Sequence, residues 1–443
     1  MVDLIVIGAG SGGLAAAKRA AAYGKNVILV ENDTIGGTCV SYGCVPKKLW
    51  HAISMAKHQF DLAQENGWKI RDKQFHWNQI QPKLLKYIQS LNQRHETKCR
   101  ELNIKIINGK ATFENEKTIK VNNQLFSAKH ILVAVGGKAK KINIPGSIHT
   151  ETSYDFFSWK EQPDSVLIWG GGYIAVELAS ILNALGTKVH LVIRQPLILR
   201  GFDHKLREFI QDKMIKRGII IHTETSLKGI HIEKNKKVCK LDNDNNIAVE
   251  KVLQAVGRIP NTEKLNCNSA KIELDKHGGI IIDNNFQTSS KNIYALGDCI
   301  NQVQLTPVAI AQARKWVDFI FNKKAFPVDF SHIPTAVFSH PEAAYIGLSE
   351  EEANTKYNDI KIKEMSFNPL TSALATNSKE PVLMKVVFQG KHMNIIGIHL
   401  ACEGAAEIIQ SLAIAFQKGI TKSDLDMTMA LHPTLTEELV TIY

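Results

Sequence analysis

The N-terminal part of the chain combines short apolar runs with a glycine-rich turn. Residues 3–7 are rich in Leu, Ile and Val with little alternation, which predicts a buried strand of a parallel sheet. A glycine-rich turn over 8–13 follows, and an alanine-rich stretch predicts a helix to about Tyr23. A second apolar run, 26–30, ends in Glu31. The pattern therefore predicts a strand, turn, helix and strand, closed by an acid.

This βαβ unit has the chemistry of a dinucleotide site. Gly8, Gly10 and Gly13 have the G-x-G-x-x-G spacing that brings backbone close to a pyrophosphate at a helix N-terminus. Glu31 stands where a carboxylate accepts a hydrogen bond from a ribose hydroxyl. The alternative is a glycine-rich turn in an unrelated α/β fold.

The same pattern returns in the middle of the chain. It predicts a strand over 165–169, a turn over 170–175, a helix to Leu185 and a strand over 188–193. Two such units in one chain predict two bound dinucleotides. The spaced positions of this second turn are occupied by Gly170, Gly172 and Ala175.

The two units differ at the end of the second strand. Where the first has Glu31, the second has Ile193 followed by Arg194, with Arg200 a short loop later. A carboxylate repels a 2′-phosphate, whereas two guanidinium groups bind it bidentately. The second site is therefore predicted to prefer NADPH to NADH. The alternative is a pair of surface arginines after a strand.

The remaining pattern predicts a discontinuous first domain and a C-terminal domain of another kind. Strands are predicted over 131–137, 252–260 and 293–298, and the polar segment 234–246 is a hairpin or a loop. After Phe330 the composition predicts an α+β domain without a nucleotide motif. Its expected elements are antiparallel strands over 336–338, 360–367, 382–388 and 395–399, with helices over 403–417 and after Thr434.

Composition and charge narrow the class of protein. The 443 residues, 44% hydrophobic and 22% charged, suit about three globular domains. The most apolar stretch, 2–22, carries Asp3, Lys18 and Arg19, so neither a membrane span nor a secretory signal is predicted. The net charge is +11, and the lysines are scattered without a nucleic-acid-binding motif. The positive charge either forms an ordinary basic surface or attracts acidic ligands. We expect a soluble, cytoplasmic protein with no nucleic-acid or membrane partner.

The cysteines point to redox chemistry. There are seven, an odd number spread widely, which favours a reducing compartment over a disulfide framework. Only Cys39 and Cys44 are close, with four residues between them, a spacing that closes a small ring within one helical turn. Such a disulfide accepts two electrons, and its thiolate attacks another disulfide. The alternatives are a structural pair and a metal half-site; because a second ligand pair is missing, no metal is expected.

With these motifs the chain resembles the FAD- and pyridine-nucleotide-dependent disulfide oxidoreductases. The resemblance implies an α/β fold with two Rossmann-like dinucleotide-binding domains plus a C-terminal α+β dimerisation domain. The implied domains are 1–138 (first part of the FAD domain), 139–260 (NADPH domain), 261–331 (second part of the FAD and central domain) and 332–443 (dimerisation domain). The resemblance spans nearly the whole chain and rests, in the family's order, on GAGSGGLAAAKRA, GGTCVSYGCVPKK, GGGYIAVELA, AVGRIPNT, YALGDC, LTPVAIAQARK, IPTAVFSHP and HPTLTEELVT.

The resemblance also implies a homodimer that binds FAD and NADPH and reduces glutathione disulfide. Residues implied to bind FAD are Gly8, Gly10, Ser11, Gly12, Glu31, Thr38, Lys47, Ala111, Asp298 and Thr306. Residues implied to bind NADPH are Gly171, Tyr173, Ile174, Glu177, Arg194, Arg200, Gly257 and Val337.

The implied reaction passes a hydride from NADPH to the flavin and then electrons to a Cys39–Cys44 disulfide. Cys39 is the implied interchange thiol and Cys44 the flavin-facing one. Lys47 pairs with Glu177 beside the flavin, and Tyr173 covers the nicotinamide pocket.

The implied acid comes from the other subunit. His432 protonates the leaving thiolate, because an imidazole titrates in the right range, and Glu437 orients it. Thr434-x-x-Glu437 also has the spacing of a capping box, which is the alternative role for Glu437.

The implied substrate contacts are mostly cationic, which suits an acidic peptide; a solvated helix face is the alternative for the lysines and Arg19. Lys18 replaces a usual arginine, His95 a usual tyrosine and Gln304 a frequent Glu, and Ser41-Tyr42 replaces a usual Asn-Val. The other readings are a reductase of a related small disulfide and a non-catalytic basic flavoprotein or nucleic-acid binder. The implied contacts are Ser11, Lys18, Arg19, Lys48, His95 and Arg314.

Overall fold

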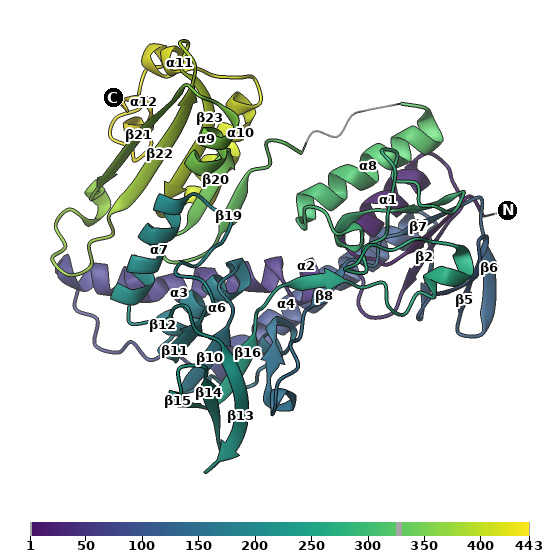
Figure 1. Ribbon diagram of the computed structural model, residues 1–443, viewed down its shortest axis with the longest axis horizontal. Helices are drawn as coiled ribbons and strands as arrows, with labels where there is room; N and C mark the ends of the chain where they lie inside the picture. Colours follow the sequence, from purple (N-terminus) through teal and green to yellow (C-terminus); the bar gives the residue numbers. More distant parts are fainter. Residues whose placement is uncertain (1, 325–329, 443) are drawn as a thin grey trace.

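The computed structural model describes residues 2–324 and 330–442, and within them three units surround two long helices. In Figure 1 the N-terminal parallel sheet lies to the right, a second parallel sheet below the centre, and the C-terminal sheet at the upper left. Helices α3 (Cys44–Glu65) and α4 (Trp77–Glu101) run across the middle. Trp50 of α3 stacks on Trp77 of α4 with ring centroids 4.1 Å apart, so aromatic packing joins the two helices.

The first sheet is parallel and buried on both faces. Leu4 pairs with Val27 and with His130, so the two predicted N-terminal strands lie side by side as expected for a βαβ unit. Helix α1 (Ser11–Ala22) packs against α8 (Thr306–Asn322) on one face. The strand order is β18 (Ile293–Ala295), β7 (His130–Val133), β1 (Leu4–Ile7), β2 (Val27–Glu31) and β3 (Lys105–Asn108).

The second sheet repeats this arrangement. Its predicted strand over 165–169 has those bounds, and α6 (Tyr173–Ala184) follows it. Helix α7 (His204–Lys216) comes after the second strand. The order is β12 (Ile220–His222), β11 (Lys188–Val192), β10 (Ser165–Trp169), β16 (Lys251–Gln254) and β9 (Glu151–Thr152), all parallel.

The polar segment 234–246 forms a hairpin and not an irregular loop. Lys234 and Asn235 both have positive φ, 47° and 63°, which gives the tight turn between two antiparallel strands. The apolar side chains of this small sheet pack on Leu167, Trp169 and Val192 of the second sheet. Its strands are β13 (Leu227–Glu233), β14 (Lys236–Leu241) and β15 (Asn246–Val249).

Three predicted strands are shorter than expected. The run 131–137 ends as a strand at Val133, and 252–260 is broken at Gly257, whose φ is +119°. Beyond these breaks β8 (Gly137–Ala139) pairs with β17 (Arg258–Pro260) in a separate antiparallel ribbon. The run 293–298 ends at Ala295 and continues as a 3₁₀ turn. Glycines change the direction of the chain at the edge of the sheet, and the spacing of apolar residues does not show where such a change ends a strand.

The C-terminal unit is an antiparallel sheet covered by helices. Residues 343–347 form a strand that the apolar pattern did not predict. The predicted helix after Thr434 is a single short turn. The sheet order is β19 (Thr335–Val337), β20 (Ala343–Gly347), β23 (Asn394–Ala401), β22 (Val382–Gln389) and β21 (Ile360–Phe367); the helices are α9 (Glu350–Lys356), α10 (Ala405–Phe416), α11 (Lys422–Met427) and α12 (Glu437–Val440).

The predicted fold class, two parallel dinucleotide-type sheets and a C-terminal α+β unit, is confirmed. Of the expected third segment, 261–331, residues 325–329 lie outside the described part of the chain, as do Met1 and Tyr443 at the ends. The remaining elements are the antiparallel strands β4 (Thr112–Asn115), β5 (Thr118–Val121) and β6 (Gln124–Ser127), with the short helices α2 (Gly37–Ser41) and α5 (Ser153–Phe156).

Candidate functional site

A cavity of about 1000 Å³ lies at the carboxyl ends of the strands of the first parallel sheet, where such folds bind ligands, and the first turns of α6 border it. The segment 334–338 of the C-terminal unit closes one side of it. The predicted residues that line it are Gly8, Gly10, Ser11, Gly12, Glu31, Thr38, Cys39, Cys44, Lys47, Lys48, Ala111, Tyr173, Ile174, Glu177, Asp298, Thr306 and Val337. Those that do not are Lys18, Arg19, His95, Gly171, Arg194, Arg200, Gly257, Arg314, His432 and Glu437.

The first glycine turn presents bare backbone to this cavity. Gly10 is the N-cap of α1 and gives it no side-chain cap, and a Cβ on Gly10 would meet nothing within 4 Å. Gly8 has φ +102°, and a Cβ there would lie 2.4 Å from the Ala134 carbonyl oxygen. The uncapped N–H groups of α1 therefore face space that suits a pyrophosphate.

Glu31 ends β2 with a fixed carboxylate. Its Oε2 accepts from the backbone N–H of Ala9 at 2.6 Å, and its Oε1 accepts from Asn32 and Asp33 at 2.9 Å. Burial raises the pKa of Glu31, while these hydrogen bonds act against the rise. The remaining lone pairs are directed by this network toward the cavity, where a ribose hydroxyl can donate to them.

The second glycine turn has the same construction. Gly172 is the N-cap of α6 without a side-chain cap, and a Cβ on it would also meet nothing within 4 Å. Arg194 and Arg200 follow β11 and are exposed. Neither forms an ion pair within the described part of the chain. Two unpaired guanidinium groups beside a dinucleotide turn match the charge of a 2′-phosphate.

The two cysteines lie on different helices and are free thiols that hydrogen-bond to each other. Cys39 belongs to α2, and Cys44 is the first residue of α3. The expectation of a single helical turn is wrong, because the chain breaks at Gly43, whose φ of −153° is non-helical. A Cβ on Gly43 would lie 2.9 Å from the Thr38 carbonyl oxygen, so glycine permits this close approach.

The pair is electrostatically asymmetric. The hydrogen bond from Cys39 lowers the pKa of Cys44 to about 6, against its burial and with help from Thr306 and the Lys47 ammonium. The same shared proton raises the pKa of Cys39. The Sγ of Cys44 lies 3.7 Å from the Thr306 hydroxyl oxygen. In the dithiol form, Cys44 therefore holds the thiolate and Cys39 the proton.

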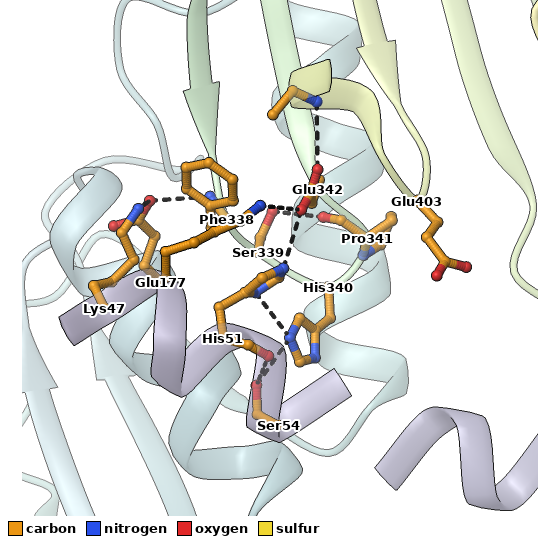
Figure 2. A network of polar contacts seen from close by, with 12 residues as sticks. Lys47, His51, Ser54, Glu177, Phe338, Ser339, His340, Pro341, Glu342 and Glu403 are labelled. Atoms are coloured by element: carbon orange, nitrogen blue, oxygen red, sulfur yellow. Dashed lines mark hydrogen bonds and ion pairs between the residues drawn. The ribbon is translucent and has the colours of Figure 1, made fainter. Parts of the chain in front are cut away.

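A buried ion pair stands beside this thiolate. The Nζ of Lys47 lies 2.6 Å from Oε1 of Glu177, and the same oxygen accepts from the backbone N–H of Phe338 at 3.0 Å (Figure 2). The Lys47 ammonium also lies 3.9 Å from the centre of the Phe338 ring. Helices α3 and α6 and the C-terminal unit thus meet at one carboxylate.

The residues predicted to contact substrate are largely engaged with other side chains. The Nζ of Lys18 lies 3.1 Å from Nδ1 of His95, and Lys48 lies 3.3 Å from Oε1 of Glu342. Two nitrogens of the Arg19 guanidinium donate to the Asp318 carboxylate at 2.5 and 2.7 Å. Arg314 is exposed on α8. A substrate carboxylate must therefore share or displace some of these partners.

His432 and Glu437 lie in the C-terminal unit, away from the cavity of their own chain. The Nδ1 of His432 lies 3.0 Å from Oε2 of Glu437, and its side chain is 79% exposed. Thr434 does not cap the last helix, because the N-cap is Thr436 and no side chain makes a capping bond. The capping-box reading of Glu437 is therefore wrong, and its carboxylate instead fixes the imidazole.

Sequence reasoning missed several residues of the site. The Tyr154 hydroxyl lies 2.8 Å from Thr38 Oγ1, and Arg258 lies 3.6 Å from Oδ2 of Asp298. His51 was also missed, although it follows Lys47 by four residues and so shares its face of α3. That spacing was the one available signal.

None of the helices formed by residues 2–324 and 330–442 is long and apolar enough to cross a membrane. In the same residues, no three His, Cys, Asp or Glu side chains come together as a metal site.

Comparison with known proteins identifies the family. Residues 2–313 match the model of the pyridine nucleotide-disulphide oxidoreductases, and residues 333–443 match their dimerisation domain. The chain belongs to this family. Over 99% of its length it is 38% identical to a glutathione reductase of Nostoc sp., of which it covers 99%. It is likewise similar to glutathione reductases of Burkholderia cepacia (37% identity) and Schizosaccharomyces pombe (39%), covering 98% of each.

Proposed function

We propose that this protein is an NADPH-dependent flavoprotein that reduces glutathione disulfide to two molecules of glutathione. The hydrogen-bonded pair Cys39–Cys44, next to the Lys47–Glu177 ion pair inside a cavity bordered by the first dinucleotide turn and the first turns of α6, carries the proposal. The similarity to three glutathione reductases over nearly the whole chain favours glutathione disulfide as the substrate.

The residues present fit both cofactors. The uncapped start of α1, the open space at Gly10 and the fixed carboxylate of Glu31 suit FAD in the first turn. The uncapped start of α6 with Arg194 and Arg200 suits NADPH in the second. FAD held by these residues would supply the transfer of an electron pair from NADPH to the cysteine pair.

The cysteines perform the disulfide exchange. Cys39 gives its proton to the partner subunit's His432 and attacks one sulfur of glutathione disulfide, forming a mixed disulfide. The released glutathione thiolate takes the proton back from that imidazole. The Cys44 thiolate then attacks the Cys39 sulfur, which re-forms the Cys39–Cys44 disulfide and releases the second glutathione as a thiolate that takes one proton from solvent. A hydride equivalent from NADPH returns the disulfide to one thiol and one thiolate, so the cycle consumes one NADPH and one proton.

The protein acts as a homodimer. His432 does not line the cavity of its own chain, which supports its service to the partner's cysteines. Large apolar side chains near it are exposed, Met427 by 74%, Met429 by 95% and Leu431 by 74%, as expected of a face covered by a second copy. Domain limits of 1–138, 139–260, 261–331 and 332–443 accompany this proposal, and the free thiols favour the reducing cytoplasm.

The test is NADPH consumption by the purified yellow protein with oxidised glutathione, with lipoamide and trypanothione disulfide as controls. Turnover with oxidised glutathione and not with the controls supports the proposal. Lys18, Arg19 and Lys48 already contact other side chains of the protein. This favours a second candidate substrate, another low-molecular-weight disulfide that carries fewer carboxylates than glutathione disulfide. That candidate is favoured if NADPH bleaches the flavin but oxidised glutathione gives no turnover. Mixing Cys39→Ser with His432→Ala subunits should regain activity, because one complete site then forms between the chains.

A further inference from the structure

A second buried carboxylate, Glu342, contacts helix α3 about one turn beyond the contact between Lys47 and Glu177. Oε1 of Glu342 lies 3.1 Å from Nε2 of His51 and 3.3 Å from Nζ of Lys48, and Oε2 accepts from the backbone N–H of Ala406 at 3.3 Å. The Glu342 side chain is only 8% exposed. Burial alone would raise the pKa of Glu342, but the His51 hydrogen bond and the Lys48 charge hold it below its ordinary value. The carboxylate is therefore ionised, and both of its oxygens have polar partners.

The network extends through two histidines whose protons are fixed by their partners (Figure 2). Because Glu342 only accepts, Nε2 of His51 carries the proton, and Nδ1 of His51 accepts from Nε2 of His340 at 3.2 Å. Burial is the main reason that the pKa of His340 lies well below its ordinary value, and the neighbouring His51 lowers it further. His340 therefore stays neutral. The Ser54 hydroxyl donates to the His51 carbonyl oxygen at 2.8 Å, and its oxygen lies 3.2 Å from Nε2 of His340, so it shares that N–H with Nδ1 of His51.

This network and the Lys47–Glu177 pair both form hydrogen bonds with the same short segment, Phe338–Glu342. Glu177 binds the segment at its first residue, and Glu342 is its last. Between them, both lysine ammonium groups lie over the Phe338 ring, with Nζ 3.9 and 4.0 Å from its centre. The position of the Lys47 charge relative to Cys44 thus depends on where this segment is held against α3.

We infer that His51 and Glu342 are positioning residues, which hold the segment Phe338–Glu342 on α3 and thereby keep the Lys47 ammonium beside the Cys44 thiolate. The two residues touch neither cysteine, and they act through Phe338 and the loop. This inference deepens the proposed function, because it concerns the cysteine pair of the same site. Loss of His51 leaves the Glu342 carboxylate without its buried donor, which favours displacement of the segment.

The test is the pH dependence of alkylation of Cys44 by iodoacetamide in the dithiol-reduced holoenzyme, with the modified residue located by mass spectrometry. We expect His51→Leu to raise the alkylation midpoint by about 0.5–1 pH unit. His51→Gln, which retains a donor toward Glu342, should return it toward that of the unmodified protein. No glutathione disulfide is used, so the result is independent of the substrate.

Glu342→Gln provides a second variant if His51→Leu does not fold, and it separates position from charge. Removing a negative charge by itself lowers a thiol pKa, so a higher midpoint in Glu342→Gln can only come from displacement of Lys47. Glu65→Gln is the matched control. Glu65 lies about 27 Å from Lys47 along the axis of α3, by helical rise. It binds the C-terminal unit at Thr376, Asn377 and Ser378.

The inference holds if the midpoint rises in His51→Leu and Glu342→Gln while Glu65→Gln is unchanged. It is overturned if a folded Glu342→Gln protein has an unchanged or lower midpoint. An equal rise in Glu65→Gln also overturns it, because general loosening of α3 would then explain the shift. Melting curves and bound flavin absorbance confirm that each variant is folded.

Discussion

Lys47 of α3 and Glu177 of α6 form a buried ion pair that joins α3 to the second dinucleotide unit, with 2.6 Å between Nζ and Oε1. Their side chains are 12% and 4% exposed. A buried pair of this kind adds little over apolar packing, but breaking it leaves a charge without a partner. The pair therefore constrains both function and stability.

Lys47→Met should lower the free energy of unfolding by about 3–5 kcal/mol, because the Glu177 carboxylate stays buried without its counterion. Denaturant unfolding followed by tryptophan fluorescence measures the change. The double variant Lys47→Met/Glu177→Gln should recover most of the loss, since no unpaired charge remains. Equal stability of the single and double variants would contradict the prediction.

The guanidinium groups after β11 should set coenzyme preference. We expect Arg194→Ala/Arg200→Ala to raise KM for NADPH by about 10- to 100-fold, since two charge-assisted phosphate contacts are lost. The KM for NADH, which has no 2′-phosphate, should change little. Lys188→Ala is the control, because it removes an exposed cation from the opposite end of the same strand. Steady-state kinetics with both coenzymes decide the outcome.

The proton shared by the cysteines should appear in the reactivity of the reduced protein. Because the pKa of Cys44 is about 6, alkylation of the reduced enzyme should rise through pH 6 and level off well below the range of an ordinary thiol. Cys39→Ser replaces the S–H donor by a hydroxyl, and Cys39→Ala removes it, so the midpoint should rise most in Cys39→Ala. Cys402→Ala should leave the curve unchanged, since burial raises the pKa of Cys402 to about 12. A midpoint near that of free cysteine in the unmodified protein would refute this picture.

The local patterns were sufficient to predict the two dinucleotide units. Strand 165–169 and the glycine turn after it are encoded within a few residues, so the sequence indicates them directly. The strand over 343–347 was not predicted, because Ala-Ala-Tyr-Ile-Gly has weak periodicity and is held by pairing with β19 and β23. The His51–Glu342 contact joins residues 291 positions apart, and no local pattern reveals such a pair. Motifs thus indicated the groups that we propose to react, whereas the contacts that we propose to position them arise from tertiary packing.

A second buried ion pair should control acid stability. Lys385, 1% exposed, donates to Asp203, the N-cap of α7, and so ties the second unit to the C-terminal sheet. Burial would raise the pKa of Asp203, but the Lys385 hydrogen bond lowers it below its ordinary value. Its stabilising effect is therefore present above the unfolded pKa of about 4 and is lost as the pH falls through the folded value.

Lys385→Met should reduce stability at neutral pH by about 3–5 kcal/mol and flatten the fall of stability at acid pH. Denaturant unfolding at pH 7 and at pH 3 to 4 measures both effects. The control is Lys216→Met, which removes an exposed lysine paired with Asp212 and should cost at most about 1 kcal/mol. If Lys385→Met keeps the acid dependence of the unmodified protein, another group is responsible.

The contact between Glu437 and His432 should be needed for disulfide exchange and not for coenzyme oxidation. Glu437→Gln removes the charge that fixes Nδ1 of His432 and stabilises its protonated form, so kcat with oxidised glutathione should fall about tenfold or more. Reduction of the flavin by NADPH should keep its rate, because that step involves no leaving thiolate for His432 to protonate. Glu438→Gln changes the neighbouring carboxylate, which makes no hydrogen bond or ion pair among the described residues, and should retain full activity. A parallel loss in both rapid-mixing bleaching and turnover would instead mean that Glu437 supports the fold.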